Sequence, residues 1–262
     1  MPNDYRFLTL STDGPVAIVT LNRPEVHNAF NAELIEELRQ AFEYLAEESS
    51  TRVVVLAGEG RSFCAGADVN WMRASLDLSE AENVADALRM ARMFDTINRC
   101  PRPVIGRVHG AALGGGVGLA AVCDVVVAAD GAVFGLSEVK LGIAPAVISP
   151  YVLAKIGRSH ARALFLTGER FGADRAQRIG LVHHVVTADG LDAEVERICG
   201  EVLTAAPHAI SRAKTLIERV PDLGHDEAMQ YTAETIAALR TGTEGQDGLR
   251  AFLERRKPGW AP

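Results

Sequence analysis

Hydrophobic and polar residues follow two different periods along the chain, and each period predicts a different element. Residues 15–21, PVAIVTL, alternate and are rich in β-branched side chains, which predicts a strand. The runs RVVVLAG at 52–58, PVIGRVHG at 103–110 and DVVVAAD at 124–130 are short and largely apolar. Runs of this kind are typical of buried strands.

Helical spacing dominates between these strands. Asn31 can cap a helix whose apolar side chains recur on one face. They are Leu34, Leu38, Phe42 and Leu45. A loop is expected at 59–70, a second helix around 79–98, and a short helix that begins in the glycines of 114–118.

The alternation of short strands with helices indicates an α/β fold. From about Asp192 onward the pattern becomes helical and polar through residue 254. We therefore expect a core at 1–191 and a helical C-terminal region at 192–262, which packs on the core or on another subunit.

Composition limits the class of partner. The 262 residues carry 34 acids against 27 bases, a net charge of −7, which argues against nucleic acid but not against a small anionic ligand. The longest uncharged apolar run, 111–123, is glycine-broken and too short to span a bilayer. The first residues, MPNDYRFL, lack the layout of a signal peptide. We expect a cytoplasmic protein with no membrane partner.

The cysteines give no sign of a metal site. Cys64, Cys100, Cys123 and Cys199 are widely spaced, without a CxxC pair or a Cys/His cluster. We expect buried free thiols and no bound metal.

The glycine-rich stretch GAALGGGVG at 110–118 follows a strand and opens a helix, which is a good geometry for binding an anion. Gly116, Gly118 and Ala121 fit the dinucleotide pattern G-x-G-x-x-A, with Asp130 after the next strand. The helix is too short for an ordinary βαβ crossover, so a nicotinamide oxidoreductase is disfavoured.

A second interpretation is an oxyanion hole. The loop GEGRSFCAGADVNWM at 58–72 also follows a strand, and small residues at 65–67 let a ligand approach its backbone. Backbone N–H groups from two such loops would stabilise a negatively charged oxygen. A tight turn without chemistry is the alternative for either loop alone. A serine hydrolase is disfavoured because no G-x-S-x-G occurs.

One carboxylate follows these loops. Glu138, in FGLSEVKLG, lies between apolar strands and the segment IAP, so burial should raise its pKa toward values useful for acid–base catalysis. The alternative is a surface glutamate paired with Lys140.

Taken together, these segments resemble the crotonase (enoyl-CoA hydratase/isomerase) family. The resemblance rests on NRPEVHNAF, SFCAGADVNWM, PVIGRVHGAALGGGVGLAAVCDVVVAAD, FGLSEVKLGIAPA and LTGERFGADRAQRIGLV. It runs from about residue 15 to GLRAFLERRKP near the end, which resembles the family's closing helix.

The resemblance implies a spiral of ββα turns, with a helical C-terminal region that forms trimers or hexamers. It implies an acyl-CoA thioester substrate, with coenzyme A as part of the substrate and no separate cofactor. The N–H groups of Ala67 and Gly115 would hold the thioester oxygen, and Glu138 would act as acid and base.

The resemblance also implies contacts with the substrate. CoA would lie along 23–29 and 65–68, with its adenine near Ala29, and Trp71 with Met72 would wall the acyl pocket unless they are ordinary core residues. Phe252 and Arg255 would reach the CoA of a neighbouring subunit, with simple solvation as the alternative for Arg255. The full set expected to contact substrate is Arg23, His27, Ala29, Ala65, Gly66, Asp68, Trp71, Gly118, Phe252 and Arg255.

The chain departs from the family at one position. Two-acid hydratases carry a first glutamate where this chain has Gly118. Glu138 would then work alone, either in a hydratase, where it handles both water and the proton for C2, or in an isomerase, where it moves a proton between two carbons. A noncatalytic acyl-CoA binder is a third possibility.

A finer resemblance favours hydration. GADVNWM, GGGVGL and SEVKLGIAPAVISPYV look like a bacterial subgroup that hydrates methylglutaconyl-CoA and isohexenylglutaconyl-CoA in leucine and acyclic terpenoid breakdown. Such a substrate has a distal carboxylate that needs a cationic partner. Arg89 and Arg92 are candidates, with solvated surface arginines as the alternative.

Overall fold

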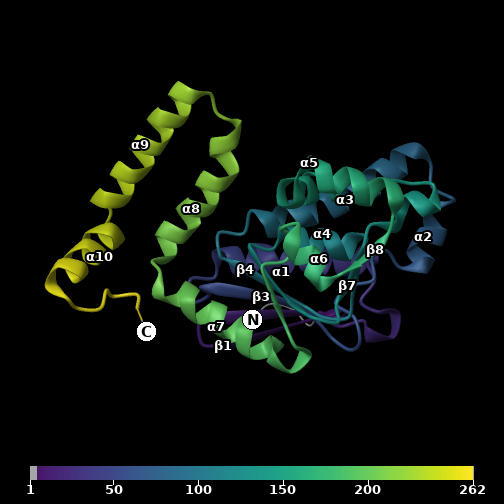
Figure 1. Cartoon of the computed structure of the whole chain (residues 1–262), viewed down its shortest axis with the longest axis horizontal. Helices are drawn as coiled ribbons and strands as arrows, with labels where there is room; N and C mark the ends of the chain where they lie inside the picture. Colours follow the sequence, from purple (N-terminus) through teal and green to yellow (C-terminus); the bar gives the residue numbers. More distant parts are fainter. Residues whose placement is uncertain (1–4, 262) are drawn as a thin grey trace.

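The computed structural model describes residues 5–261, and the strands in that range form two sheets (Figure 1). The larger, six-stranded sheet has the order β1-β2-β3-β4-β6-β9. Its strands are β1 Leu8–Asp13, β2 Val16–Leu21, β3 Val53–Gly58, β4 Val104–Val108, β6 Val125–Ala129 and β9 His184–Val186. The three-stranded sheet consists of β5 Ala111–Leu113, β7 Val133–Gly135 and β8 Arg170–Gly172. The expected α/β fold is confirmed.

The helices lie between the strands along the chain, and the last four follow the final strand. They are α1 Ala32–Glu47, α2 Val69–Ser75, α3 Glu80–Asn98, α4 Gly115–Val122, α5 Ser149–Thr167, α6 Ala173–Arg178, α7 Leu191–Thr204, α8 Pro207–Arg219, α9 His225–Thr241 and α10 Thr243–Glu254. Short 3₁₀ turns include Pro24–Val26 and Ser137–Leu141.

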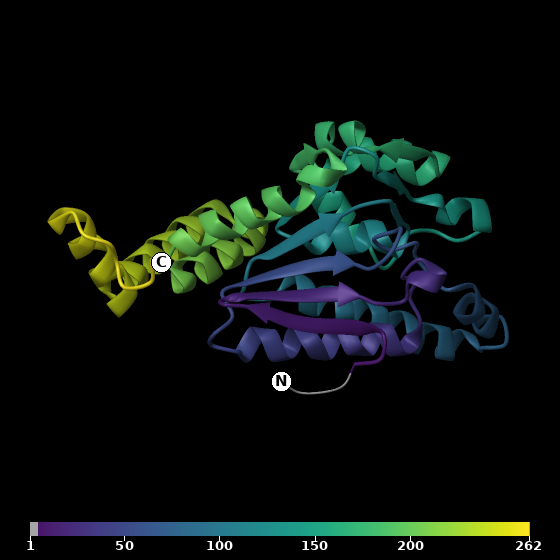
Figure 2. The same ribbon diagram turned by 90° about the horizontal axis from the view of Figure 1, so that it is seen from below.

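The large sheet is parallel except for β1, which is antiparallel to β2. All six residues of β3 are buried, because helices cover both of its faces. On one face α1 and α3 pack together over the sheet, and Figure 2 shows α1 running along the strands. On the other face α7 packs Leu191, Val195 and Ile198 against β3, β4 and β6.

Side chains cap the starts of α1 and α3, and the cap expected at Asn31 is confirmed. The side chain of Asn31 accepts a hydrogen bond from Leu34 N at 2.8 Å and caps α1. Ser79 and Glu82 form a capping box at the start of α3. Each cap satisfies backbone N–H groups that would otherwise have no partner in the first turn.

The connection between β4 and β6 corrects one expectation. The two strands pair in parallel, with Ile105 opposite Val125, although α4 has only eight residues. The strand β5 carries the chain into the smaller sheet before α4, so strand and helix together make the crossover. A short helix therefore does not exclude a parallel return.

The C-terminal helices divide into two parts. The first, α7, belongs to the packing of the core, whereas α8, α9 and α10 project away from it as an arm (Figures 1 and 2). Lys214 in α8 anchors the arm through an ion pair of 2.6 Å with Asp124. Arg52 donates to the carbonyls of Leu203 and Ala205, next to the corner between α7 and α8. The boundary at 191/192 stays a prediction.

No helix within residues 5–261 is both long enough and apolar enough to cross a membrane.

Candidate active site

Loops from both sheets meet at one edge of the molecule. Loops 22–31, 59–68 and 109–114 follow β2, β3 and β4, which are parallel neighbours, so their carboxyl ends lie side by side. A fourth segment, 136–142, follows β7 of the smaller sheet. The carboxyl ends of parallel strands are the usual place for a ligand site in an α/β protein.

Backbone hydrogen bonds join the second loop to the glycine-rich turn. Phe63 N donates to His109 O at 2.9 Å and Cys64 N to Ala111 O at 3.0 Å. Leu113 N donates back to Cys64 O at 2.9 Å. This short parallel ladder fixes the two loops relative to one another.

Some glycines of the turn are needed because the loops approach so closely. A Cβ atom at Gly110 would lie 2.0 Å from Arg61 O, and one at Gly116 would lie 2.1 Å from Cys64 O. Any side chain at either position would force the loops apart. The glycine richness of 110–118 therefore has a structural cause besides any role in catalysis.

The two expected oxyanion donors lie on adjoining loops. A Cβ atom at Gly66, whose φ is +92°, would lie 3.7 Å from Gly115 N. The parallel bridge between Phe30 and Ala67 uses the carbonyl of Gly66 and the N–H of Asp68, which leaves the Ala67 N–H outside it. Gly115 is the first residue of α4, so its N–H has no partner within the helix. Both donors are available to a ligand.

Glu138 lies beside this pair of loops. Its Oε1 atom is 3.1 Å from the position of a Cβ at Gly114, the residue before the expected donor Gly115. The Oε2 atom is buried and has no hydrogen-bond partner among the described residues. Burial raises the pKa of the Glu138 carboxyl. The alternative of a surface glutamate paired with Lys140 is wrong, because the carboxyl points inward and no such ion pair forms within residues 5–261.

Gly118 is buried in α4, next to core side chains. A Cβ atom there would lie 2.3 Å from Ile148 Cγ2 and 3.0 Å from Phe94 Cε1. The expected contact between Gly118 and substrate stays a prediction. No side chain fits at 118 while Ile148 keeps its place.

A buried ion pair between Arg23 and Asp68 joins the loop 22–31 to the loop 59–68. Arg23 is 8% exposed, donates to Ala29 O and forms a 2.8 Å ion pair with Asp68. Asp68 also accepts from Asn70 N at 2.7 Å at the start of α2. Burial opposes ionisation of Asp68, but the hydrogen bonds from Asn70 and Arg23 outweigh it and lower its pKa. Both residues, expected to touch CoA, are largely buried in this network and position the loops that would touch it.

Asn28 is a site-forming residue that the sequence analysis missed. It is fully buried with φ of +56°, accepts from Arg23 N at 2.8 Å, and donates to the carbonyls of Glu59 and Ser62 at 2.8 Å each. Asn tolerates the left-handed region better than most residues, so an Asn inside the turn NRPEVHN was the available signal. One side chain thus joins the first loop to the second.

His27, Ala29, Ala65 and Gly66 lie where expected, on the first two loops. The carbonyl of His27 accepts from Ala65 N at 2.9 Å. The ring nitrogen Nδ1 of His27 lies 3.1 Å from Ser62 Oγ. Ala29 is 5% exposed, with its carbonyl occupied by Arg23.

Other expected contacts fall outside this cluster. Trp71 in α2 is partly buried against the main core, in line with the core-packing alternative. Phe252 is 83% exposed and, with Arg255, belongs to the end of the arm, away from the loops of its own chain (Figure 1). Arg89 forms an ion pair of 2.6 Å with Asp86 on its own helix, and Arg92 is exposed.

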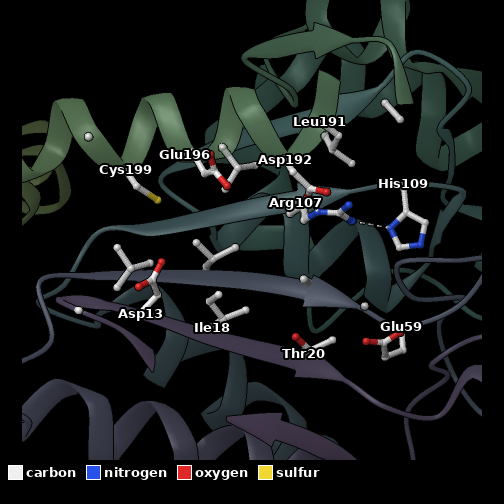
Figure 3. Close-up of a pocket in the computed structure, with 18 of the residues that line it drawn as sticks. Asp13, Ile18, Thr20, Glu59, Arg107, His109, Leu191, Asp192, Glu196 and Cys199 are labelled. Carbon is white, nitrogen blue, oxygen red and sulfur yellow. Dashed lines mark hydrogen bonds and ion pairs between the residues drawn. The ribbon is translucent and has the colours of Figure 1, made fainter. Parts of the chain in front are cut away.

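A groove of about 1000 Å³ lies elsewhere, between α7 and the strands β2 and β3 (Figure 3). Its lining includes Ile18, Arg107 and Leu191 but none of Ala67, Gly115 and Glu138. Within residues 5–261 no group of three or more His, Cys, Asp or Glu could hold a metal ion.

Comparison with known proteins gives consistent matches over nearly the whole chain. A family model described as enoyl-CoA hydratase/isomerase matches residues 11–262. The short-chain-enoyl-CoA hydratase of Clostridium acetobutylicum is 33% identical over 250 residues, 95% of each chain. An enoyl-CoA hydratase from Shewanella pealeana has 38% identity and a TM-score of 0.95, over 98% of this chain and 96% of that one. AtuE from Pseudomonas aeruginosa has 35% identity and a TM-score of 0.95, over 98% and 100%.

Proposed function

Because this chain belongs to the enoyl-CoA hydratase/isomerase family, we propose that it adds water across the C2=C3 double bond of an enoyl-CoA. The observation that carries the proposal is the position of Glu138. A buried carboxyl group without a hydrogen-bond partner on Oε2 lies beside a turn whose Gly115 N–H adjoins the loop of Ala67. Acid–base catalysis next to two backbone donors is the chemistry that a thioester enolate requires.

In the proposed reaction, the Ala67 and Gly115 N–H groups donate to the thioester oxygen. The Glu138 carboxylate takes a proton from water as the water oxygen bonds to C3, and the π electrons move to form the enolate. The protonated Glu138 then gives that proton to C2, and the carbonyl reforms. Glu138 ends as it began, as a carboxylate, so one acid is sufficient for the cycle.

Burial of Glu138 supports both halves of this cycle. A raised pKa makes the carboxylate a stronger base toward water and keeps the proton available for return to C2. Each preorganised oxyanion donor typically lowers the activation barrier of such reactions by about 3–4 kcal/mol. In a noncatalytic acyl-CoA binder, burial of this carboxyl group would destabilise the fold without contributing to the activity.

Coenzyme A enters the proposal as part of the substrate, with no separate cofactor. It would lie along the loops 23–29 and 65–68, whose mutual position is fixed by the Arg23–Asp68 ion pair and by Asn28.

The runner-up is a Δ3,Δ2-enoyl-CoA isomerase. The observation that favours it is the filled space at Gly118, which leaves no room at that position for a second acid beside Glu138. Glu138 would remove a proton from C2 of a 3-enoyl thioester, and return it to C4 of the resulting dienolate.

The identity of the acyl group is a finer part of the proposal. A branched 3-methylglutaconyl substrate rests on the sequence resemblance of GADVNWM and AVISPYV, and the latter supplies Ile148 beside Gly118. Arg89 and Arg92 are the candidates for the distal carboxylate; both are exposed on α3, and Arg89 is paired with Asp86 at 2.6 Å.

Assembly into trimers or hexamers is likewise proposed. The arm buries almost none of its own side chains, and it exposes Ile217 by 76%, Phe252 by 83% and Leu253 by 79%. A neighbouring subunit would cover such residues, and Phe252 and Arg255 would then reach its CoA.

The test is mass spectrometry of products from 3-methylglutaconyl-CoA, crotonyl-CoA and a 3-enoyl-CoA, each with wild type and with Glu138→Gln. Gain of one water on a 2-enoyl substrate, lost in the variant, is expected. A conjugated product of unchanged mass from the 3-enoyl substrate, without hydration of either 2-enoyl ester, would show that the enzyme is an isomerase and not a hydratase. No conversion in any mixture would overturn both.

A further inference from the structure

Ile148 occupies the space into which a side chain at position 118 of α4 would project. It is 3% exposed, and it is the residue before α5, where its carbonyl accepts from Val152 N at 3.1 Å. Its Cγ2 atom lies 2.3 Å from the position of a Cβ at Gly118. Proline within the first two positions of α5 restricts the backbone here, so Ile148 has little freedom to withdraw.

Phe94 fills the same space together with Ile148. Its Cε1 lies 3.0 Å from the Cβ position at Gly118, and the ring is fully buried. It packs edge-on against Phe30, with ring centroids 6.1 Å apart, and lies at the same distance from Tyr151. Because the conflict at 118 begins at the Cβ atom, no choice of rotamer would relieve it.

A carboxyl group at 118 would matter chemically. Position 118 follows Gly114 by one helical turn, and Gly114 is the residue that faces Glu138 Oε1. An acid there would approach the same reacting atoms from α4, giving paired carboxylates that could divide the proton transfers. Ile148 and Phe94 fill that space with apolar atoms.

We infer that Ile148 is a specificity-determining residue, which restricts this enzyme to one-acid chemistry by excluding every side chain from position 118. The inference rests on the proposed function, because it concerns the acid–base groups of the same site. It assigns the hydration-to-isomerisation ratio to a pair of residues, Gly118 and Ile148, rather than to Gly118 alone.

The steric half of the inference is tested without substrate, by a double-mutant cycle in thermal stability. Gly118→Ala should lower the melting temperature strongly with Ile148 present and much less in the background of Ile148→Ala. The control is Ile156→Ala, another buried isoleucine of α5, in whose background Gly118→Ala should remain fully destabilising. Equal effects of Gly118→Ala in all three backgrounds would overturn the inference.

The chemical half is tested with Gly118→Glu in the same Ile148→Ala background. The double variant should increase hydration relative to isomerisation by at least about tenfold, because a positioned acid or base typically contributes about 10²–10⁴-fold. An unchanged ratio in a folded double variant that still binds CoA esters would overturn the role. If wild type hydrates nothing, the proposed function fails, whereas the stability cycle still decides the steric coupling.

Discussion

The Oε1 atom of Glu138 lies 3.1 Å from the point that a Cβ atom at Gly114 would occupy. Gly114 has φ of +50° and is the residue immediately before α4, so the same glycine shapes the start of the helix and makes room for the acid. The carboxyl group and the turn that carries the expected oxyanion donor Gly115 are therefore placed by one backbone feature.

Gly114→Ala should separate these two groups. The new methyl group would press on Glu138, and its backbone would be held in a region that costs alanine about 1–3 kcal/mol. We expect kcat to fall at least about tenfold with Glu138 still present. Steady-state kinetics with a matched Gly131→Ala control check this, since Gly131 has nothing within 4 Å of its Cβ position. Equal kinetics in the two variants would contradict the placement.

Glu138→Gln should remove catalysis and keep the shape of the site. Turnover should fall by about 10²–10⁴-fold, because the amide can neither take nor return the proton. Binding of a CoA ester, measured by calorimetry, should persist within a few fold. Retained turnover in this variant would exclude Glu138 as the acid–base group.

The same residue should give a defined pH dependence. Burial raises the pKa of Glu138 in the folded protein, so the carboxylate needed to start hydration is lost at a higher pH than for an ordinary glutamate. The acidic limb of the kcat/KM profile should therefore lie above the usual range of this side chain. A limb at the usual value would show that the group is solvated in the working enzyme.

As pH rises, the stability of the folded protein should fall while the activity that depends on the Glu138 carboxylate rises. Below the unfolded-state pKa both states are protonated and burial of Glu138 costs no charge. As pH rises through the higher folded-state pKa, the folded protein must bury an anion and loses stability. Glu138→Gln should therefore raise the melting temperature at pH 8 and leave it nearly unchanged at pH 4.

The sequence predicted the site best where chemistry and local pattern coincide. Glu138 and the two glycine-bearing loops were expected from residue type and local pattern, and the structure brings them together. Asn28 was missed because its role depends on hydrogen bonds to Glu59 and Ser62, which only the folded loops bring near. Long-range pairing of this kind leaves no local signature.

The elements of the fold were likewise predictable where a local pattern exists and not predictable where it is absent. The strands β2, β3, β4 and β6 and the helices α1 and α3 follow strong periodic patterns, and the structure has them within a few residues of the expected ends. The strands of the smaller sheet have three residues each, too few for a period to appear. The conflict between Gly118 and Ile148 also joins distant residues, so position 118 could be identified as a departure but not explained.

The Arg23–Asp68 pair allows a prediction about stability. Both side chains are buried, at 10% and 6% exposure, so removing one partner leaves a charge without compensation. Arg23→Met should destabilise the protein by about 3–5 kcal/mol, as measured by denaturant unfolding. Arg39→Met is the control, because Arg39 pairs with the more exposed Glu36 and Glu43, and such pairs contribute about 0–1 kcal/mol. Similar losses in both variants would contradict the positioning role.

The arm depends on few contacts with the core, and Lys214 makes a central one. Its Nζ lies 2.6 Å from Asp124 Oδ2 and also donates to Arg102 O, whereas Asp124 keeps a second hydrogen bond from Val104 N. Lys214→Met should therefore loosen the arm and leave the sheet intact. Hydrogen exchange should accelerate in α8, α9 and α10 while β3 and β4 stay protected. Arg197→Met, which removes an ion pair confined to α7, should change neither region, and faster exchange in the sheet of the Lys214 variant would show that the arm supports the core itself.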